Sequence, residues 1–323
     1  MNTIDYYLKK YCPDANITYV ELGVNWKNSE FLKRKIIQSD KVIVNGEGTI
    51  HHNTKNGKLL IELAKFSASY DVKSFLINMT YQDNDESYID YLKYFNRIYV
   101  RESYSHKQLE DHNISSKVIP DLSLFNDQEN KSKKNGKYLI TDSVKKDITK
   151  ELLDKFSHHP STSFISVFNE NIFYKSKSKG STLMRIIRNN SFKNILSKSY
   201  NALKKRITSE KILPIFYVET HQEYDDEISR HKLALCGRFH TMMFCINNGT
   251  PFIALKSNSH KVEGVINDIG LDVNKFIVDI NKIDIDYLDD FILTDNEREL
   301  IKGYRNIAKS KIDSMFKDIL SYE

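Results

Sequence analysis

The sequence predicts an α/β protein of two halves built on parallel sheets, and three observations carry this prediction. Short apolar runs alternate with amphipathic helical patterns along most of the chain, as expected where crossover helices join parallel strands. A polar stretch without periodicity, residues 126–137, interrupts the alternation and is the best candidate for a linker. The length of 323 residues suffices for two domains with a sizeable core.

The first half of the chain, residues 1–125, opens on a helical pattern at residues 6–11. Apolar runs typical of strands follow at residues 17–22, 41–44, 73–77, 97–100 and 117–119. The helical patterns that alternate with them lie at residues 30–38, 56–70, 85–95 and 103–112.

The second half, residues 138–323, repeats this alternation. Strands are predicted at residues 138–140, 164–167, 215–218, 233–236 and 251–255, with helices at 147–157 and from Arg238 onward. Thr294 and Glu297 form the pattern of a capping box, so a long final helix is expected to begin there.

The composition predicts a globular protein, with 40% hydrophobic and 28% charged residues. No apolar run approaches the roughly 20 residues that span a bilayer, and no leader pattern follows Met1, so we expect a cytoplasmic protein. The three cysteines, Cys12, Cys236 and Cys245, lack the spacing of metal ligands. We therefore expect reduced thiols and neither a metal nor a bound cofactor.

The net charge of +5 is unevenly distributed. Residues 175–211 hold eleven Lys or Arg and one acid, Glu210, a net +10, so the remainder of the chain carries −5. Apolar residues recur within this segment at helical spacing, which predicts a basic amphipathic helix or helix pair. Such a segment either lies on an anionic membrane surface or folds its apolar face onto the second domain. Nucleic acid is not expected, because the segment has few aromatic residues for base stacking.

The turn after the strand at 233–236 is the most informative chemical feature. Gly237 is followed by Arg238, Phe239 and His240 at the start of a helix. Such turns bind anions in parallel sheets, because free N–H groups and the positive end of the helix dipole point outward together. An arginine fork matches carboxylate or phosphate, and a histidine can move a proton near neutral pH. The turn therefore predicts a site for an anionic substrate.

The loop after the strand at 41–44 is the second such feature. Gly46 and Gly48 allow a ligand to approach the backbone closely, although no Gly-Lys-Ser/Thr follows as in a Walker loop. Glu47 between them would accept hydrogen bonds from hydroxyl groups of a ligand or serve as a base. The loop also contributes the polar residues Thr49, His51 and His52. The sequence does not decide which histidine faces the ligand, because neighbouring side chains point to opposite sides of an extended chain.

Further candidates follow other predicted strands. Arg101 emerges at the same sheet edge as the glycine loop and is expected either to pair with Glu47 or Asp121 or to contact the ligand. On the second domain, His221 follows the strand at 215–218. Three polar residues that suit a phosphate follow the strand at 251–255, namely Lys256, Ser257 and Lys261.

In order along residues 42–271, these segments resemble the polysaccharide pyruvyl transferase family. The matching motifs are VIVNGEGTIHHN (42–53), IYVRESYSHKQL (98–109), VIPDLSLF (118–125), GRFH (237–240), GTPFIAL (249–255), KVEG (261–264) and DIGL (268–271). The resemblance implies transfer of an enolpyruvyl-derived unit from phosphoenolpyruvate, as co-substrate, to sugar hydroxyls. The product would be a pyruvate ketal on a bacterial surface polysaccharide, such as a capsule, or on its lipid-linked precursor. The resemblance also implies two Rossmann-like domains facing a cleft, as in GT-B glycosyltransferases.

The resemblance implies roles for the candidate residues. His240 would protonate the enol and Arg238 would clamp the donor, with Phe239, Lys261, Lys256 and Ser257 on the donor side. Glu47 is the third catalytic candidate, and the acceptor would meet the glycine loop, Arg101 and His221. Because acceptors in this family are often lipid-linked, the resemblance makes peripheral association of residues 175–211 with the inner face of the plasma membrane one of the two alternatives for that segment, beside packing on the second domain.

Two departures from the family keep other functions open. The chain opens on a helical pattern where members begin with a strand, and residues 138–142 (YLITD) hold no arginine where many members carry one. An arginine there would help to hold phosphoenolpyruvate. The alternatives are therefore a GT-B glycosyltransferase that uses a nucleotide-activated sugar and a non-catalytic binder of anionic glycan or lipid.

Overall fold

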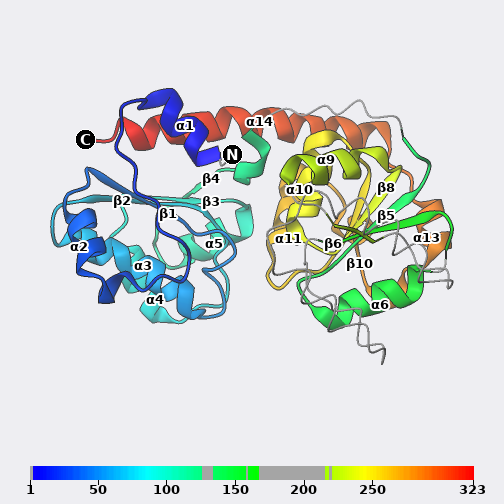
Figure 1. Ribbon diagram of the computed structural model, residues 1–323, viewed down its shortest axis with the longest axis horizontal. Helices are drawn as coiled ribbons and strands as arrows, with labels where there is room; N and C mark the ends of the chain where they lie inside the picture. The colour runs from blue at the N-terminus through cyan, green and yellow to red at the C-terminus, as the bar shows by residue number, and fades with distance from the viewer. Residues whose placement is uncertain (1–2, 126–133, 158, 167–214, 218–219) are drawn as a thin grey trace, which may run out of the picture.

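The computed structural model describes residues 3–125, 134–157, 159–166, 215–217 and 220–323. Within them the chain forms two α/β domains that lie side by side (Figure 1). The first domain carries a parallel sheet in the order β1-β2-β3-β4. Its strands are β1 (Lys41–Asn45), β2 (Lys73–Met79), β3 (Arg97–Val100) and β4 (Lys117–Val118).

Helices cover both faces of this sheet (Figure 1). They are α1 (Thr3–Tyr11), α2 (Glu30–Ile37), α3 (Lys55–Ala68), α4 (Glu86–Leu92) and α5 (Ser103–Asp111), with short 3₁₀ turns η1 (Trp26–Asn28) and η2 (Leu122–Phe125). The central strand β2 is buried from Ser74 to Met79. Its nearly continuous apolar run is what a strand covered on both faces requires.

The second domain carries a six-stranded parallel sheet in the order β10-β9-β8-β5-β6-β7. Its strands are β5 (Tyr138–Thr141), β6 (Thr162–Ser166), β7 (Ile215–Tyr217), β8 (Leu233–Cys236), β9 (Phe252–Leu255) and β10 (Ile277–Val278). The chain runs from β5 outward to β6 and β7, and then returns to β8 on the other side of β5. Ligands of open parallel sheets bind at such a reversal, just beyond the carboxyl ends of the strands. Here the reversal lies between β5 and β8.

The helices of the second domain follow its strands. They are α6 (Lys146–Phe156), α9 (His221–Arg230), α10 (Phe239–Asn248), α11 (Lys261–Ile269), α12 (Val273–Phe276) and α13 (Ile285–Asp290), with the 3₁₀ turn η3 (Ile280–Lys282). The predicted strands and helices of both halves are confirmed from residue 30 onward, to within a few residues at their ends, wherever the structure describes them.

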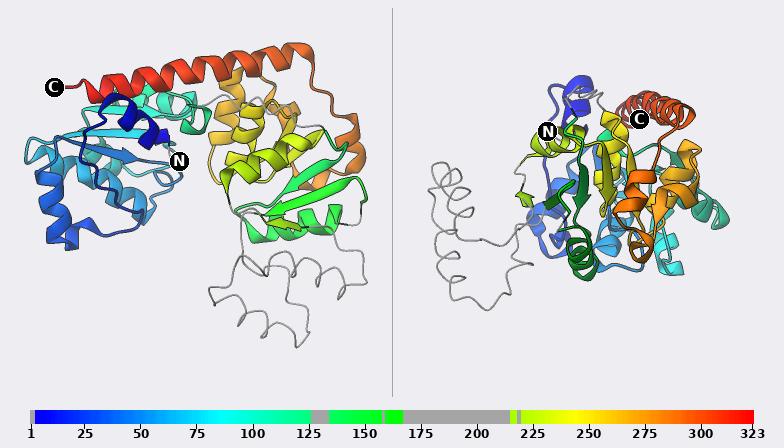
Figure 2. Two further views of the ribbon diagram at one scale, coloured as in Figure 1. Left: turned by 45° about the horizontal axis from the view of Figure 1, so that its top comes forward. Right: turned by 90° about the vertical axis from the view of Figure 1, so that its right-hand side faces the viewer.

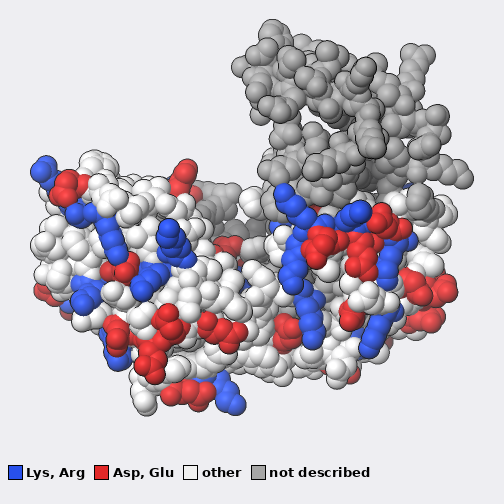
Figure 3. All heavy atoms as spheres, turned by 90° about the horizontal axis from the view of Figure 1, so that it is seen from below, with Lys and Arg blue, Asp and Glu red and all other residues white. Residues whose placement is uncertain are grey.

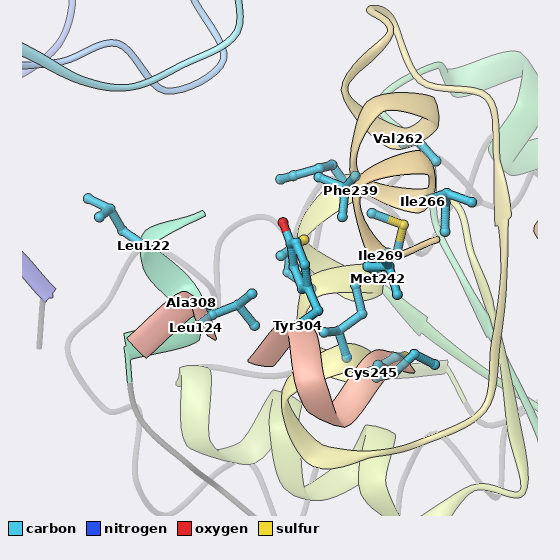
Figure 4. Packing of buried hydrophobic residues seen from close by; sticks show 14 of the residues in the cluster. Leu122, Leu124, Phe239, Met242, Cys245, Val262, Ile266, Ile269, Tyr304 and Ala308 are labelled. Carbon is cyan, nitrogen blue, oxygen red and sulfur yellow. The ribbon is translucent and has the colours of Figure 1, made fainter. Parts of the chain in front are cut away.

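One helix, α14 (Asp295–Leu320), spans both domains (Figure 2). The predicted capping box of Thr294 and Glu297 opens it. Its first half packs on the second domain, where Tyr304 and Ala308 join the core around α10 and α11 (Figure 4). Its last turns lie on the first domain, where the Phe316 ring stacks on Tyr7 with centroids 4.6 Å apart. The helix therefore ties the two domains together.

The strand predicted at residues 17–22 is wrong. These residues form an exposed loop, with Tyr19 61% and Leu22 55% exposed. The run has apolar residues at odd and even positions alike, so it offers no single face to a sheet. The helical start of the chain is confirmed as α1.

The basic segment at 175–211 lies outside the described residues, so its two predicted roles stay predictions. Within the described ranges, no helix combines the length and apolar character needed to cross a membrane. The three cysteines are free, and Cys236 and Cys245 are buried in the second domain with their sulfur atoms 3.8 Å apart.

Candidate active site

The carboxyl ends of the two sheets face each other across a recess, which the space-filling view shows on the face opposite α14 (Figure 3). Glu47, two residues after β1, meets His240, the second residue of α10. His240 Nε2 lies 2.8 Å from Glu47 Oε1, with 46% of the histidine side chain and 37% of the glutamate side chain exposed. The structure thus brings together the two features that the sequence predicts separately in each domain.

The Glu47 carboxylate is held by both domains. Asn78 Nδ2, from the end of β2, donates a hydrogen bond of 3.3 Å to Glu47 Oε2. The hydrogen bond from His240 and the nearby charge of Arg101 lower the pKa of Glu47 to about 2, against the opposing effect of burial. Glu47 is therefore anionic at neutral pH, which suits it to hold a protonated imidazole.

The turn that presents His240 depends on Gly237. A Cβ at this position would lie 2.5 Å from the backbone oxygen of Asp142, so only glycine fits where β8 ends beside β5. The Gly237 amide donates to Thr141 Oγ1 at 2.9 Å. Arg238 is the N-cap residue of α10, and its side chain does not cap the helix. The start of α10 therefore lacks a cap from the side chain of its N-cap residue, and the anion site that the sequence predicts at this turn stays a prediction.

Arg238 itself forms a bidentate ion pair with Asp142, the residue after β5. Arg238 Nε lies 2.8 Å from Asp142 Oδ1, and one terminal nitrogen lies 2.9 Å from Oδ2. Asp142 is 1% exposed and also accepts a 3.0 Å hydrogen bond from Ser166 Oγ. The sequence predicts Arg238 as a substrate clamp, but its fork is directed at a buried carboxylate at the sheet reversal. A substrate anion would have to share or displace that carboxylate.

Arg101 is buried between the domains. Its Nε donates to Thr80 Oγ1 at 2.7 Å, and a terminal nitrogen lies 3.1 Å from Asp121 Oδ2. The guanidinium stacks over the Phe239 ring, with 4.4 Å from its central carbon to the ring centroid. Of the two ion pairs predicted for Arg101, the structure contains the one with Asp121. Phe239 therefore contributes a contact between the domains.

Lys261 begins α11 and is 8% exposed. Its Nζ donates to Asn258 Oδ1 at 2.9 Å and lies 5.7 Å from the Phe239 ring centroid. Burial, with the charge of Arg101 second, lowers the pKa of Lys261 to about 8, although Asp121 and Glu47 oppose this. Lys261 is thus a buried cation at neutral pH, and its pKa responds to the charges of Arg101, Asp121 and Glu47 in the first domain.

The two histidines of the glycine loop form a chain of contacts with Asp83. His51 Nδ1 lies 3.0 Å from His52 Nδ1, and His52 Nε2 lies 3.3 Å from Asp83 Oδ2. His52 is exposed, whereas His51 is 6% exposed. Burial, followed by the charge of Lys261, lowers the pKa of His51 to about 4, with the Gly48 backbone opposing. The structure therefore assigns the interior side of the loop to His51 and the solvent side to His52.

The remaining candidates fall into two groups. Thr49 Oγ1 bonds the Gly46 carbonyl at 3.3 Å, and Gly48 has a φ of 66°, so both shape the loop. Three others are described by their own exposure and contacts. His221 is exposed beside the Phe244 ring, Lys256 is exposed, and Ser257 Oγ contacts Asn258 at 3.2 Å.

The domains also interlock beside the recess, where α5 meets α11. Asp268 Oδ2 accepts a 2.9 Å hydrogen bond from the Ser103 amide at the start of α5. The buried Glu102 lies 3.4 Å from His260 Nε2. A Cβ at Gly264 would lie 2.7 Å from Glu102, so glycine permits this approach. These contacts fix Lys261, on α11, relative to the first domain.

Sequence reasoning missed Asn78, Asp83 and Asp142. Asn78 lies at the end of β2, and Asp83 lies in the loop that follows β2. Asp142 is the residue after β5. Their location at the carboxyl ends of predicted parallel strands could have identified them as site residues, because these strand ends lie at the same edge of a sheet. Within the described ranges, no group of three or more His, Cys, Asp or Glu could hold a metal ion.

Comparisons with known proteins agree with this architecture. A sequence model of the polysaccharide pyruvyl transferase family matches residues 1–259. Among solved structures, a UDP-N-acetylglucosamine 2-epimerase aligns with a TM-score of 0.54 and 10% identity over 98% of this chain and 84% of that chain. The α,α-trehalose-phosphate synthase (UDP-forming) from Burkholderia xenovorans, in complex with glucose-6-phosphate, aligns with a TM-score of 0.51 and 9% identity over 92% and 78%.

At such identities the likeness concerns the fold alone, two Rossmann-like domains facing a cleft as in GT-B enzymes. A search among curated proteins returned no match.

Proposed function

The chain belongs to the polysaccharide pyruvyl transferase family and is a transferase, and we propose that it uses phosphoenolpyruvate to form a pyruvate ketal on a sugar. The acceptor would be a bacterial surface polysaccharide, such as a capsule, or its lipid-linked precursor. The 2.8 Å contact between His240 and Glu47 is the observation that carries the proposal. The contact supports the proposal because a proton donor at this point would lie where substrates held by different domains would meet.

His240 acts as the general acid in this proposal. A ring proton of the His240 imidazolium is transferred to the methylene carbon of phosphoenolpyruvate, while the carbon that bears the phosphate is attacked by a sugar hydroxyl. The bond to phosphate then breaks with its electron pair on the leaving group, and a second hydroxyl completes the ketal. Glu47 stabilises the imidazolium before transfer, because it stays anionic at neutral pH. Glu47 is therefore an electrostatic partner here and not the base.

The donor is proposed to bind at the start of α10. The N-terminal end of that helix and the Lys261 ammonium would offer positive potential to a phosphate or carboxylate. Arg238 would contribute only by sharing its fork with Asp142. Lys256 and Ser257, the first two residues after β9, are the remaining candidates on the donor side.

Because the Arg238 guanidinium binds Asp142, we retain one alternative function, a glycosyltransferase that uses a nucleotide-activated sugar. Its diphosphate would be held by Arg238 and Lys261. The non-catalytic binder is not carried further, because the chain belongs to a family of transferases.

Ligand-induced stabilisation tests the proposal against this alternative. A ligand that binds only the folded protein raises the melting temperature, by an amount that grows with concentration over Kd. Phosphoenolpyruvate should raise the melting temperature, whereas UDP-glucose and UDP-N-acetylglucosamine should not. The reverse pattern would reject the proposed donor and select the glycosyltransferase.

We also propose that the protein works at the inner face of the plasma membrane, held there by residues 175–211. The support is the net +10 charge of this segment in the sequence and the lipid-linked acceptors that the proposed function implies. On the face seen in Figure 3, by contrast, the described residues show acidic and basic side chains interspersed.

A further inference from the structure

Asn78 interrupts the regular alternation of side chains in β2, the central strand beside the glycine loop. Phe75 and Ile77 belong to one hydrophobic core, whereas Leu76 and Met79 belong to another. Because alternate side chains of a strand point to opposite faces, Met79 would be expected with Ile77. The register between β2 and β3 also shifts between Leu76 and Met79. Asn78 is therefore the extra residue of a β-bulge, a feature that redirects side chains near active sites.

The backbone of Asn78 is left-handed, with a φ of 56°. Residues that carry a side chain rarely adopt this conformation unless their surroundings determine it, and such residues concentrate at functional sites. The side chain is also buried, since only 4% of the residue is exposed. A buried amide needs polar partners, and Asn78 has two.

These two partners fix which end of the amide faces Glu47. The Leu122 N–H, at the start of η2, donates to Asn78 Oδ1 at 3.4 Å. A carboxylate only accepts hydrogen bonds, so Asn78 Nδ2 faces Glu47 Oε2, 3.3 Å away. Neither hydrogen bond could form with the amide reversed. Asn78 therefore anchors the Glu47 carboxylate to a fixed part of the first domain.

Glu47 has few other restraints on its side chain. It lies between the two glycines of its loop, and 37% of its side chain is exposed, so several rotamers are open to it. Asn45 Nδ2 lies 3.5 Å from the same oxygen, but Asn45 is exposed, and its hydrogen bond competes with water. The buried Asn78 amide holds Oε2, which leaves Oε1 for His240 Nε2 in the second domain.

We propose that Asn78 is a positioning residue for the transfer reaction, because its amide holds Glu47 in the orientation that presents one carboxylate oxygen to His240. This inference rests on the proposed function. Asn78 touches neither substrate and acts through Glu47 alone. Without the amide, the Glu47 carboxylate would turn toward solvent, and the imidazolium of His240 would lose its anion. The loss should therefore appear in kcat and leave phosphoenolpyruvate binding unchanged.

The first test uses Asn78→Gly, because glycine adopts the left-handed conformation without strain and removes the amide. Phosphate release and the ketal methyl signal in NMR measure the rate, with phosphoenolpyruvate and methyl glycosides that have free 4- and 6-hydroxyls. Asn78→Gly should lower kcat about tenfold and keep the melting shift that phosphoenolpyruvate causes. Asn113→Gly, at an exposed asparagine with a φ of 57°, is the matched control and should change neither. A kcat for Asn78→Gly within about threefold of wild type would overturn the assignment.

A double-mutant cycle separates positioning from a purely structural role. Glu47→Ala removes the group that Asn78 holds, so adding Asn78→Gly to it should lower kcat by less than about twofold. If Asn78 only supported the fold, the two losses would multiply, and the double variant would be about tenfold slower than Glu47→Ala. That outcome would overturn the assignment.

Asn78→Asp gives an arm that keeps the side chain. It retains an acceptor for the Leu122 amide but places a second carboxylate against Glu47, so kcat should fall at least about tenfold relative to wild type at about pH 8. Two neighbouring carboxylates raise the pKa of one of them, and the protonated group can again donate a hydrogen bond. Part of the loss should therefore be regained at about pH 5.5. A ratio to wild type that is the same at both pH values would reject a donor role for the amide.

The wild-type protein separates failure of this inference from failure of the proposed function. Wild-type protein that transfers nothing from phosphoenolpyruvate would reject the proposed function, and the Asn78 assignment with it. Wild-type transfer that survives Asn78→Gly unchanged would reject the Asn78 assignment alone.

Discussion

Two ion pairs at the start of α10 differ in almost every physical respect. The pair of Glu47 and His240 joins the two domains, makes one contact, and leaves both side chains over a third exposed. The pair of Arg238 and Asp142 lies within the second domain, is bidentate, and includes a carboxylate that is 1% exposed. An exposed pair can exchange partners at little cost, whereas breaking a buried pair strands a charge. We infer that the first pair serves chemistry and the second holds the fold.

Breaking the buried pair should have the largest effect on stability. Asp142→Asn removes the charge that Arg238 faces and should lower the free energy of unfolding by about 3–5 kcal/mol. Denaturant unfolding followed by fluorescence measures it. The matched control is Ser166→Ala, which removes one hydrogen bond to the same carboxylate and should cost about 1 kcal/mol. Equal losses in the two variants would contradict a dominant role for the charge.

Removing the exposed histidine should instead abolish turnover. His240→Ala should lower kcat about 10²–10⁴-fold, as expected for loss of a general acid, while the melting temperature stays near that of wild type. The phosphoenolpyruvate-induced melting shift should persist, because a proton donor acts mainly in the transition state. Activity within a few-fold of wild type would remove His240 from the mechanism.

Lys261 offers a pH-dependent way to sharpen the comparison. Its pKa is lowered to about 8 by burial, so donor affinity should be full below pH 8 and fall as the pH rises above it. Its effect on folding has the opposite sign, because the cost of burying the charge disappears between about pH 8 and its ordinary pKa of 10.5. The effect on donor affinity is measured by recording the melting temperature at increasing phosphoenolpyruvate concentrations, at several pH values from 7 to 9. Lys261→Met should weaken binding about tenfold and remove the pH dependence; a dependence that persists would exclude Lys261.

The smallest effect is expected from the basic segment. Each Lys or Arg near an anionic surface contributes about 1 kcal/mol, and salt screens the effect. Replacing Lys204, Lys205 and Arg206 with Glu should release the protein from anionic vesicles in co-sedimentation, yet spare activity on a soluble acceptor. Wild-type protein that stays in the supernatant with anionic vesicles at low salt would reject the membrane proposal.

The sequence predicts the alternation of strands and helices well, because period-2 and period-3.6 patterns are local properties. The run at residues 17–22 shows the limit of such reasoning. Its residues have strand propensity, but none of the strands in the described part of the chain pairs with them, and β1 is the edge of the described sheet. Pairing is a property of the whole sheet and cannot be read from one segment.

The site illustrates the same limit at the level of side chains. Glu47 and His240 stand out in the sequence because each follows a strand at a glycine turn. Their contact depends on how α14 and the interlock of α5 with α11 set the two domains, which no local pattern encodes. The sequence likewise predicts that Arg238 is available to a substrate, because its partner Asp142 lies far away in the sequence. The residue that faces a charged side chain decides its role.

Stability and turnover measured together in Glu47→Gln and Asp142→Asn test the division between the two pairs most directly. Glu47→Gln keeps a similar shape but loses the anion that holds His240, so its melting temperature should stay within about 2 °C of wild type while kcat falls about 10-fold or more. Asp142→Asn should lose about 10 °C of melting temperature, a shift consistent with a loss of about 3–5 kcal/mol, yet keep kcat within a few-fold at temperatures where it is folded. A Glu47→Gln variant that loses stability but keeps its turnover would contradict the account.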